Sequence, residues 1–428
     1  MKRWLYAGLM RALQPWLRCK LRRRAIQEPA YGLNMAQRWG CYDTPPQPIP
    51  LWIHAVSLGE TRAAGILLDE LRRIRPDGPV LLTHGTATGM AQGRAWLRPG
   101  DAQAWLPWDT PEAVAGFLDH FQPRLGLLME TEVWPELARA CQARGIDLVL
   151  ANARLSEKSL RQALRLSFWA KPAYQALGAV WPQSDADAQR FARLGVVRMQ
   201  TLGNLKFDVQ PDAQQAARGQ ALRLRLNRPV LMLASSREGE EAAWADALPR
   251  DARCLPWVVP RHPQRFDAVA DLLSARGWQV WRASSLTWTE ADLQACAAPG
   301  AVVLGDTLGE MAFYYSVAHV ALMGGSFERH GGQNLIEALA CGCPVVLGPH
   351  TYNFEQASAE ALTRGAALRA TDLAQAVEIS LDLCRPHSPR EAMAAQGLSL
   401  VRRHRGTATA MAQAVLQRLE RALTSAGH

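Results

Sequence analysis

Asn334 and Glu337 lie three residues apart, shortly after two glycine pairs, Gly324-Gly325 and Gly331-Gly332. At the start of a helix, this spacing puts an amide and a carboxylate on one face of the first turn. Glycines let a ligand approach the backbone, and the N–H groups of a helix N-terminus bind anions. A carboxylate suits a phosphate poorly but accepts two hydrogen bonds from a ribose diol. The stretch therefore predicts a nucleotide site, with the phosphate toward the glycines and the sugar on Glu337.

A plainer interpretation of this stretch is a strand–helix–strand unit in which Glu337 only complements the helix dipole. An apolar strand over 317–323 leads into it, the helix closes at Gly342, and a strand starts at Pro344. A glycine-rich loop alone would favour that interpretation. The complete order of Glu, Gly and Pro-Val-Val resembles the donor-nucleotide half of the two-domain (GT-B) glycosyltransferases, which favours nucleotide binding.

Two carboxylates in the first half of the chain follow apolar strands. Glu60 stands at a strand-to-helix turn after the run 51–56, and Glu130 directly follows the run 124–129. Because the carboxyl ends of parallel strands meet at one edge of a sheet, we expect Glu60 and Glu130 to lie close together. A carboxylate there can act as general base on a substrate hydroxyl. Glutamate is also common in first helical turns, so Glu60 by itself fits either role.

Cations follow other strands. Lys206 closes the first half and could reach a leaving phosphate, although a solvated linker cation is the usual role of such a lysine. Arg261 matches phosphate geometry and His262 follows it, although a histidine there is more often a cap or core residue. The turn 305–310 could wrap a base or phosphate. The turn 234–241 offers two hydroxyls before an acidic helical turn, which is also the pattern of a helix cap.

Strands and helices alternate along the chain, which predicts parallel sheets covered by helices on both faces. Strands of the first half are expected at 51–56, 79–83, 102–106, 124–129, 147–150, 179–181 and 199–202. Strands of the second half are expected at 230–234, 255–259, 278–281, 301–304, 317–323 and 344–347. The pattern predicts an α/β fold of two Rossmann-like, doubly wound domains facing each other across a cleft, with ligands at the carboxyl ends of the strands.

Four segments are expected along the chain. Residues 1–24 form a basic amphipathic helix, 25–207 an N-terminal Rossmann-like domain, 208–228 a linker, and 229–428 a C-terminal Rossmann-like domain with terminal helices. With 428 residues, 48% of them hydrophobic and 20% charged, the composition is that of a globular protein, neither disordered nor polytopic. The eight cysteines are scattered without a Cys-x-x-Cys pair, and no secretory signal precedes them, so a reduced cytosolic compartment is expected.

The net charge of +9 belongs to one end of the chain. The first 24 residues hold eight cations and no acid, which leaves 40 cations against 39 acidic residues elsewhere. On a helical wheel, Arg3, Arg11, Arg18 and Arg22 fall on one side and apolar residues fill much of the rest. The segment is too short to span a bilayer and predicts an interfacial helix on anionic lipid. A basic surface helix docked on its own domain is the alternative.

Motifs spread over nearly the whole chain resemble those of one family. They are Trp52–Glu60, Leu106–Asp109, Met129–Pro135, Ala151–Ser156, Gly203–Asp208, Pro260–Pro263, Gly305–Glu310, Gly324–Glu337 and Gly348–Phe354. In this order they are similar to the bacterial Kdo transferases (3-deoxy-D-manno-octulosonic acid transferases of lipid A and lipopolysaccharide core biosynthesis). The resemblance implies an inverting GT-B glycosyltransferase with CMP-Kdo as donor and a lipid A precursor (lipid IVA) as acceptor. It also implies no cofactor or metal, and a place at the cytoplasmic face of the bacterial inner membrane.

The resemblance also implies residue roles. Glu60 matches the family's general base, and Glu130 and Lys206 match its charged helpers. The CMP-binding segments match Arg261, His262, Leu308, Gly309, Glu310, Asn334, Leu335, Ile336 and Glu337. Gln333 and Leu335 stand where the family often has His and Pro. Gln333 can form hydrogen bonds but cannot be protonated, so it offers no positive charge to a phosphate. The 25–207 domain would bind the acceptor and the 229–428 domain the CMP-sugar.

Two rival functions fit parts of the sequence. A different GT-B nucleotide-sugar glycosyltransferase or an epimerase would share the fold, although a basic amphipathic N-terminus argues against a soluble small-molecule epimerase. A nucleic-acid-binding protein is suggested by the sequence pI of about 9.4. The near-neutral charge outside residues 1–24, and the lack of a basic–aromatic binding motif, predict that nucleic acid is not a partner.

Overall fold

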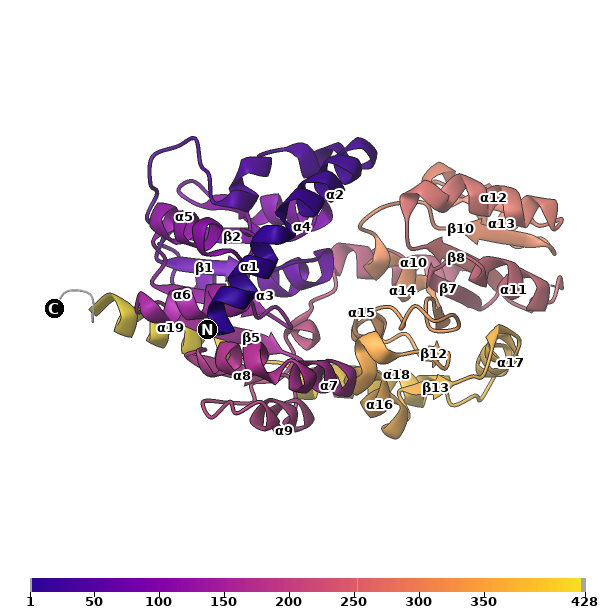
Figure 1. Cartoon of the computed structure of the whole chain (residues 1–428). Coiled ribbons are helices and arrows are strands. Elements are labelled where there is room, and N and C mark those ends of the chain that lie inside the picture. The colour runs from indigo at the N-terminus through magenta and orange to yellow at the C-terminus, as the bar shows by residue number, and fades with distance from the viewer. Residues whose placement is uncertain (1, 252, 425–428) are drawn as a thin grey trace. The chain divides into compact units, whose positions relative to one another are not determined.

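Two units, each built on one parallel sheet, make up the chain, and the computed structural model in Figure 1 describes residues 2–251 and 253–424 of it. Unit 1 contains the chain up to Asp208 and again from Gly406 onward, and unit 2 contains Val209–Arg405. The expected fold class, two doubly wound α/β domains, is confirmed by the parallel pairing within both sheets.

The six-stranded sheet of unit 1 has the order β3-β2-β1-β4-β5-β6, with every neighbouring pair parallel. Its strands are β1 Leu51–His54, β2 Val80–His84, β3 Ala102–Trp105, β4 Leu125–Met129, β5 Asp147–Ala153 and β6 Ala179–Pro182. The strand order reverses between β1 and β4, and ligands of doubly wound sheets bind at the carboxyl ends of the strands at such a switch point. Glu60 follows β1 and Glu130 follows β4, so this topology brings both to the switch point.

Helices cover both faces of that sheet because its strands are apolar on both sides. They are α3 Leu58–Ile74, α4 Ala87–Gly93, α5 Pro111–Phe121, α6 Pro135–Ala143, α7 Glu157–Arg165, α8 Ser167–Gln175, α9 Asp185–Arg193 and α19 Thr407–Thr424, with 3-10 turns η3 Arg94–Trp96 and η4 Leu205–Asp208. In β1, Trp52 enters one core with Phe117 of α5, and Ile53 enters the other with Met411 of α19. Full burial of one such side chain contributes about 1.5–3 kcal/mol.

The seven-stranded sheet of unit 2 has the order β13-β12-β11-β7-β8-β10-β9. Its strands are β7 Val230–Ser236, β8 Leu255–Pro260, β9 Gln279–Arg282, β10 Ala301–Leu304, β11 Val320–Met323, β12 Val345–Leu347 and β13 Ala367–Arg369. The order reverses between β7 and β11. The turn after β7 and the glycine-rich loop after β11 therefore share the switch point of this sheet.

The helices of unit 2 largely follow the expected alternation. They are α10 Ala213–Arg225, α11 Glu240–Ala247, α12 Phe266–Ala275, α13 Glu290–Cys296, α14 Met311–Val317, α15 Leu335–Ala340, α16 Glu355–Thr363, α17 Leu373–Leu383 and α18 Arg390–His404, with 3-10 turns η5 Pro263–Arg265, η6 Ala283–Ser285 and η7 Tyr352–Phe354. Helix α16 and the strand β13 were not expected from the sequence, and neither was helix α13. Its capping box, in which Thr289 and Asp292 bond each other's backbone N–H groups, is the signal that marks it.

The chain divides differently from the predicted segments 208–228 and 229–428. Most of the predicted linker is α10, which packs against α14 of unit 2, where a Cβ on Gly219 would come within 2.5 Å of the Phe313 carbonyl oxygen. The last helix, α19, belongs to unit 1, where Asp208 accepts the backbone N–H groups of Gly406 at 2.7 Å and Ala408 at 2.6 Å. The expected strand at 199–202 is reduced to one bridge between Val180 and Met199.

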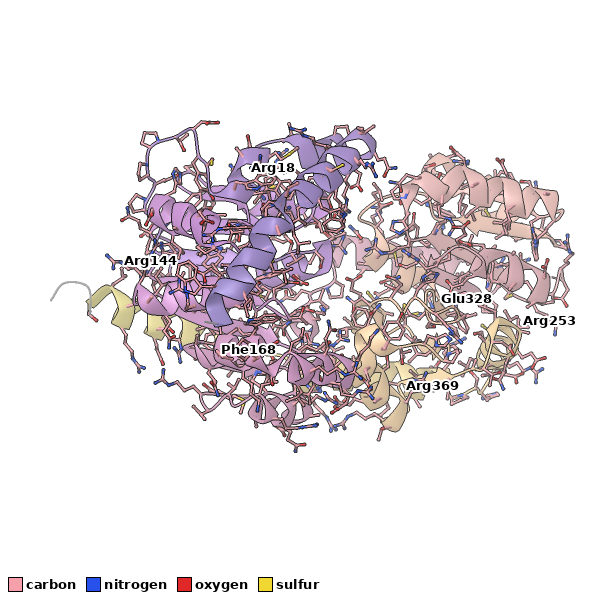
Figure 2. The ribbon with its side chains drawn as sticks, viewed as in Figure 1. Arg18, Arg144, Phe168, Arg253, Glu328 and Arg369 are labelled. Atoms are coloured by element: carbon pink, nitrogen blue, oxygen red, sulfur yellow. The ribbon has the colours of Figure 1, made fainter. Side chains whose placement is uncertain are left out.

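The N-terminal segment forms two helices rather than one, α1 Lys2–Ala12 and α2 Gln14–Gln27, followed by the 3-10 turns η1 Pro29–Gly32 and η2 Met35–Trp39. The break falls where Pro15 occupies the first turn of α2, a position that suits proline. Tyr6 donates to Asp109 at 2.6 Å, and Leu21 is buried with Tyr31, so both helices dock on unit 1. Figure 2 marks Arg18 on α2.

The docked helices leave an apolar face in solvent. Its exposed side chains are Trp4, Leu5, Leu9, Leu13 and Trp16, with Trp4 75% exposed. No helix in the described part of the chain has the length and apolar character needed to cross a bilayer. The alternative predicted for this segment, a basic helix docked on its own domain, is therefore present. The same helices also expose the apolar face that membrane association would use.

Candidate active site

The turn after β1 places Glu60 in the first turn of α3. Ser57 caps the helix by accepting the Glu60 N–H at 3.4 Å, and the Glu60 carboxylate accepts the Val56 N–H at 2.6 Å. A serine cap with a glutamate three residues later is a frequent helix start, because each side chain satisfies backbone donors that the helix leaves unpaired. The local sequence therefore fixes the position of this carboxylate.

The surroundings of Glu60 change its acidity. Burial first, and the charges of Glu130 and Glu132 with it, raise the pKa of Glu60 to about 7 against the opposite effect of the hydrogen bonds from Val56 and Ser57. Burial also raises the pKa of Glu132. A carboxylate with a pKa near neutrality is both partly ionised and basic enough to accept a proton at neutral pH, which is the property a general base needs.

Glu130 and Lys206 form an ion pair with 2.7 Å between Lys206 Nζ and Glu130 Oε1. Glu130 has a φ of +58°, a left-handed conformation that is uncommon for residues other than glycine. Two backbone hydrogen bonds hold Glu130 in this conformation. The Glu130 N–H donates to the Ala151 carbonyl oxygen, and the Arg154 N–H donates to the Glu130 carbonyl oxygen, both at 3.0 Å. Lys206 is carried by η4, whose Leu205 N–H donates to Asn152 at 3.0 Å. Glu130 lies close enough for its charge to raise the pKa of Glu60, as expected for these two residues, and the ion pair of Glu130 with Lys206 is an addition that the sequence did not predict.

Unit 2 gathers cations at the carboxyl ends of β7 and β8. Arg237 Nη1 lies 2.5 Å from His262 Nε2, and Arg261 Nε donates to Gln333 Oε1 at 3.3 Å. Burial lowers the pKa of His262, and the charges of Arg237, Arg261 and Arg265 lower it further. A neutral His262 accepts the Arg237 N–H through Nε2, which puts its own proton on Nδ1. The cluster suits an anion such as a phosphate or carboxylate.

A buried carboxylate holds the glycine-rich loop against this cluster. Glu240 accepts backbone N–H groups from Arg237 and Gly325, both at 2.8 Å, and from Phe327 at 3.3 Å. A Cβ on Gly324 would come within 2.5 Å of the Ser235 oxygen, so only glycine permits this approach. Figure 2 marks the loop at Glu328. The turn after β7 and the loop after β11 therefore form one surface.

Asn334 and Glu337 contact each other as their spacing predicts. Asn334 caps α15 by accepting the Ile336 N–H at 3.1 Å, and its amide donates to Glu337 Oε1 at 3.0 Å. Leu335 and Ile336 have fully buried side chains, so only their backbone atoms can face a ligand. The amide of Asn334 fixes the orientation of the Glu337 carboxylate.

The turn after β10 holds the remaining predicted residues, and β10 neighbours β8. Leu308 is 73% exposed and Gly309 has a φ of +79°. Glu310 accepts the Thr307 hydroxyl at 2.5 Å and lies 3.4 Å from Arg218 of α10. The residues predicted to bind CMP thus follow the carboxyl ends of β8, β10 and β11, which lie at one edge of the sheet.

Sequence reasoning missed Arg237. The turn 234–241 was interpreted as two hydroxyls before an acidic helical turn or as a helix cap. In the structure Ser235 and Ser236 belong to β7, and Gly239 stands at the N-cap of α11 without a side-chain hydrogen bond. Arg237 could have been found from the predicted order of the strands. Arg237 directly follows the first strand of a doubly wound half, and that strand borders the switch point.

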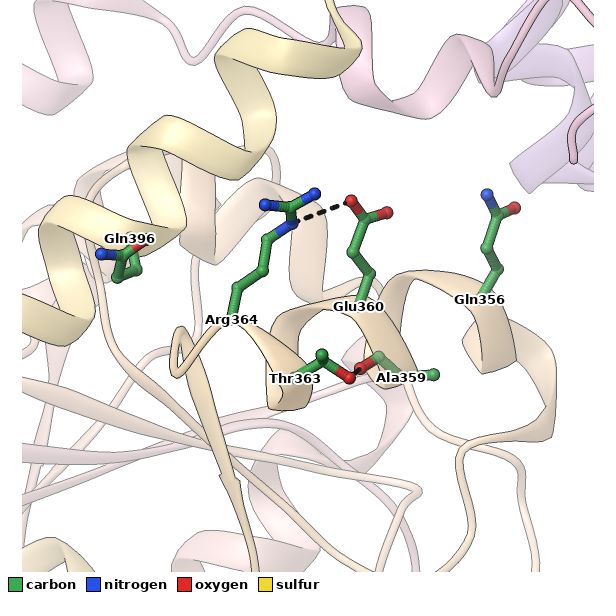
Figure 3. Close-up of a pocket in the computed structure, with 6 residues that line it drawn as sticks. All are labelled: Gln356, Ala359, Glu360, Thr363, Arg364 and Gln396. Atoms are coloured by element: carbon green, nitrogen blue, oxygen red, sulfur yellow. Dashed lines mark hydrogen bonds and ion pairs between the residues drawn. The ribbon is translucent and has the colours of Figure 1, made fainter.

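A hollow of about 650 Å³ lies elsewhere on unit 2, between α16 and α18 (Figure 3). Gln356, Ala359, Glu360, Thr363, Arg364 and Gln396 line it. It is open to solvent, and none of the predicted site residues contributes to it. Within residues 2–251 and 253–424, no group of three or more His, Cys, Asp and Glu side chains is placed to hold a metal ion.

Two Rossmann-like domains, with carboxylates at one switch point and cations at the other, define the class as a two-domain (GT-B) α/β protein of the glycosyltransferase kind. A family model described as 3-deoxy-D-manno-octulosonic-acid transferase (kdotransferase) matches residues 33–209. A 3-deoxy-D-manno-octulosonic acid transferase of Bordetella pertussis is 42% identical over 425 residues, 95% of this chain and 97% of that protein. One from Haemophilus influenzae is 30% identical over 98% of this chain and all of that protein. The chain belongs to the Kdo transferase family, a family of glycosyltransferases.

The structure of a UDP-GlcNAc 2-epimerase from Neisseria meningitidis, bound to UDP-GlcNAc, is similar in fold alone. Its TM-score is 0.56 at 13% identity, over 87% of this chain and all of that one. The family membership expected from the ordered motifs is confirmed, and so is the GT-B fold class.

Proposed function

We propose that the protein transfers Kdo from CMP-Kdo to a lipid A precursor (lipid IVA), with inversion at the anomeric carbon and with Glu60 as general base. The observation that carries the proposal is the position of Glu60, at the switch point of unit 1, with a pKa raised to about 7 by burial and by the charges of Glu130 and Glu132. Family membership supports Kdo transfer, and the site supplies the chemistry.

In this mechanism Glu60 accepts the proton of the acceptor hydroxyl. The hydroxyl oxygen forms a bond to the anomeric carbon of Kdo from the face opposite CMP, and the bond between that carbon and the CMP phosphate oxygen breaks. Lys206 and Glu130 supply fixed charges near the base. Such preorganised charges stabilise a transition state because they need not reorient as the reaction proceeds.

Unit 2 holds the donor in this proposal. Arg237, Arg261 and His262 bind its anionic groups, and Glu337 accepts the ribose hydroxyls. The backbones of Leu308, Gly309, Glu310, Asn334, Leu335 and Ile336 line the nucleotide. Arginine N–H groups and oriented backbone dipoles can stabilise the leaving CMP, so we propose a reaction that needs neither metal nor cofactor.

One incubation tests the function. Purified protein with CMP-Kdo and a lipid A precursor should yield CMP and a product heavier by one or more Kdo groups, read by mass spectrometry. An epimerase would instead return an isomer of unchanged mass. Release of CMP without a heavier lipid would contradict the proposed acceptor.

Glu337→Ala is expected to weaken CMP binding by about tenfold, because one carboxylate that accepts ribose hydroxyls contributes on the order of 1.5 kcal/mol. Calorimetry with CMP measures the change, and circular dichroism checks the fold. Glu290→Ala is the control, at an exposed glutamate in the first turn of α13 that is not part of the proposed site, and it should leave CMP affinity unchanged. Unaltered CMP affinity in Glu337→Ala would leave Glu337 a helix-dipole role only.

We propose that α1 and α2 hold the protein on the anionic cytoplasmic surface of the bacterial inner membrane. The apolar face defined by Trp4, Leu5, Leu9, Leu13 and Trp16 would enter the headgroup layer. The exposed Arg22 and Arg23 would each add about 1 kcal/mol near anionic lipid. Near-neutral charge elsewhere supports a membrane surface rather than nucleic acid as the partner of this basic segment.

A triple variant, Trp4→Ser, Leu5→Ser and Leu9→Ser, should therefore release the protein from anionic liposomes in a sedimentation assay. Substitution is a sharper test than deleting residues 2–20, because deletion also removes the hydrogen bond from Tyr6 to Asp109. Val197→Ser, at another exposed apolar residue of unit 1, is the control and should still sediment. Unchanged sedimentation of the triple variant in moderate salt would contradict the proposal.

A further inference from the structure

The turn that carries Glu60 is tied to the end of β2. The Val56 carbonyl oxygen accepts the Gly85 N–H at 3.2 Å, the Thr86 N–H at 3.0 Å and the Thr86 hydroxyl at 2.9 Å. The same residue donates its N–H to the Glu60 carboxylate at 2.6 Å. Any displacement of Val56 therefore displaces a hydrogen-bond partner of the proposed base.

His84, the last residue of β2, is 1% exposed, and its side chain contacts this turn. Its Nδ1 lies 3.0 Å from the Ala55 oxygen and 3.3 Å from Thr61 Oγ1. The Thr61 hydroxyl already donates to the Ser57 oxygen at 2.8 Å, so it can only accept from His84. One imidazole thus contacts the residue before the turn and the helix after it.

The other side of the ring fixes its tautomer. Gln103 Nε2 of β3 lies 3.1 Å from His84 Nε2 and also donates to the Met90 oxygen at 2.8 Å. Because a carbonyl only accepts, the amide nitrogen faces Met90, and this nitrogen can only donate to His84. His84 Nε2 is then an acceptor, and the proton lies on Nδ1, where it is donated to Ala55.

The imidazole stays neutral at physiological pH. Burial lowers the pKa of His84 to about 4, against the hydrogen bond to Ala55. The titratable group beside it, His54, is fully buried, and its pKa is lowered to about 3 by burial first and by His84 second. Gly93 of α4 closes the site, because a Cβ there would come within 2.5 Å of His84 Nε2.

We propose that His84 is a positioning residue for the proposed base, and that the chain of contacts from Gln103 through His84 to Ala55 and Thr61 fixes the turn that aims the Glu60 carboxylate. The inference rests on the proposed function of Glu60. The contacts link three neighbouring strands: Gln103 is on β3, His84 is on β2, and Ala55 follows β1. His84 itself neither touches substrate nor takes up a proton.

The test compares two replacements of His84. Asparagine places an amide nitrogen near the position of Nδ1 and keeps the donor to Ala55, whereas leucine removes it. His84→Leu is expected to lower kcat by about tenfold to a hundredfold, since small misplacements of a reacting group have effects of that size. KM and CMP affinity should stay unchanged, and His84→Asn should keep kcat within about threefold of the unmodified protein.

The pH profile of kcat separates positioning from stability. The titratable groups that face Glu60 are Glu130 and Glu132, with Lys206 paired to Glu130, and none of them changes in these variants. A moved acid limb in His84→Leu therefore reports altered surroundings of Glu60. His120→Leu is the matched control, a nearly buried histidine of unit 1 that stacks on Tyr42, and it should lower the Tm while leaving the profile in place.

An unmoved acid limb in His84→Leu, with a loss of kcat no larger than in His120→Leu, would overturn the proposal. If His84→Leu does not fold, Gln103→Leu answers the same question, because it frees Nε2 and no longer fixes the tautomer; a moved limb there supports the proposal and an unmoved one overturns it. Glu60→Gln runs alongside. Full activity in Glu60→Gln would overturn the role of Glu60, whereas an inactive Glu60→Gln with a normal His84→Leu overturns the role of His84 alone.

Discussion

Replacing Glu60 by glutamine is expected to lower transfer by about a hundredfold or more, because glutamine cannot accept the proton of the acceptor hydroxyl. CMP binding, measured by calorimetry, should stay as it is, since the proposed nucleotide residues all belong to unit 2. A fixed-time assay with CMP-Kdo and a detergent-dispersed lipid A precursor gives the turnover of both proteins.

The assignment of Glu60 as general base also predicts how turnover depends on pH. The pKa of Glu60 is raised to about 7, and only the ionised carboxylate accepts a proton, so turnover should rise as the pH increases through 7. Glu60→Gln should lack this limb. Near-normal turnover in the variant, or the same limb in both proteins, would contradict the assignment.

The same raised pKa predicts a gain in stability. In the unfolded chain Glu60 ionises near pH 4.5, so above that pH folding must neutralise or bury a charge, and the cost is complete above about pH 7. Glutamine removes the charge. Glu60→Gln should therefore be more stable than the unmodified protein at pH 8, by about 1–3 kcal/mol in denaturant unfolding, and should show no such gain at pH 4. A functional carboxylate that lowers stability is the usual trade-off of an active site.

Much of the fold follows from local sequence. Apolar runs bounded by glycine, proline and turn residues mark the strands of both sheets except β13, because a parallel strand is covered on both faces and needs no polar alternation. The Ser57 cap and Glu60 can be recognised from four consecutive residues. Asn334 and Glu337 meet because a first helical turn always brings such a pair together.

Long-range partners do not follow in that way. The pairing of Lys206 with Glu130 depends on the order of β4, β5 and β6, and on η4 returning to the sheet. Helix α19 shows the stripe Met411, Val415 and Leu419, but a stripe does not say which unit it covers. It was therefore assigned to the wrong domain, although Asp208 and Gly406 lie side by side where the chain leaves and re-enters unit 1.

Gln333 shows how a departure from the family pattern is accommodated. A histidine at this position could carry a positive charge to the donor phosphate, and an amide cannot. In the structure Gln333 accepts a hydrogen bond from Arg261 at 3.3 Å. The amide therefore orients a cation that is always charged, so the phosphate binding proposed for this cluster should not require a protonated group at position 333.

Replacing Lys206 by methionine is expected to have the second large effect, on stability and on turnover together. The side chains of Lys206 and Glu130 are 17% and 9% exposed, so the lysine neutralises a carboxylate that water scarcely reaches. Removing one partner of such a pair leaves a buried charge, and unfolding should become easier by about 2–4 kcal/mol. Turnover should fall by about a hundredfold, because a fixed charge beside the base is lost.

A double-mutant cycle separates the two effects. Glu130→Gln in the Lys206→Met background removes the uncompensated charge, so stability should return toward that of the unmodified protein while turnover stays low. Arg73→Met is the matched control: Arg73 pairs with Glu70 at 2.8 Å but is itself 66% exposed, and Glu70 keeps the hydrogen bond from Thr409, so the loss of Arg73 should leave the Tm nearly unchanged. If Lys206→Met costs no more stability than Arg73→Met, the pair is a surface contact. If the double variant regains turnover together with stability, the two charges serve the fold of unit 1 and not the reaction.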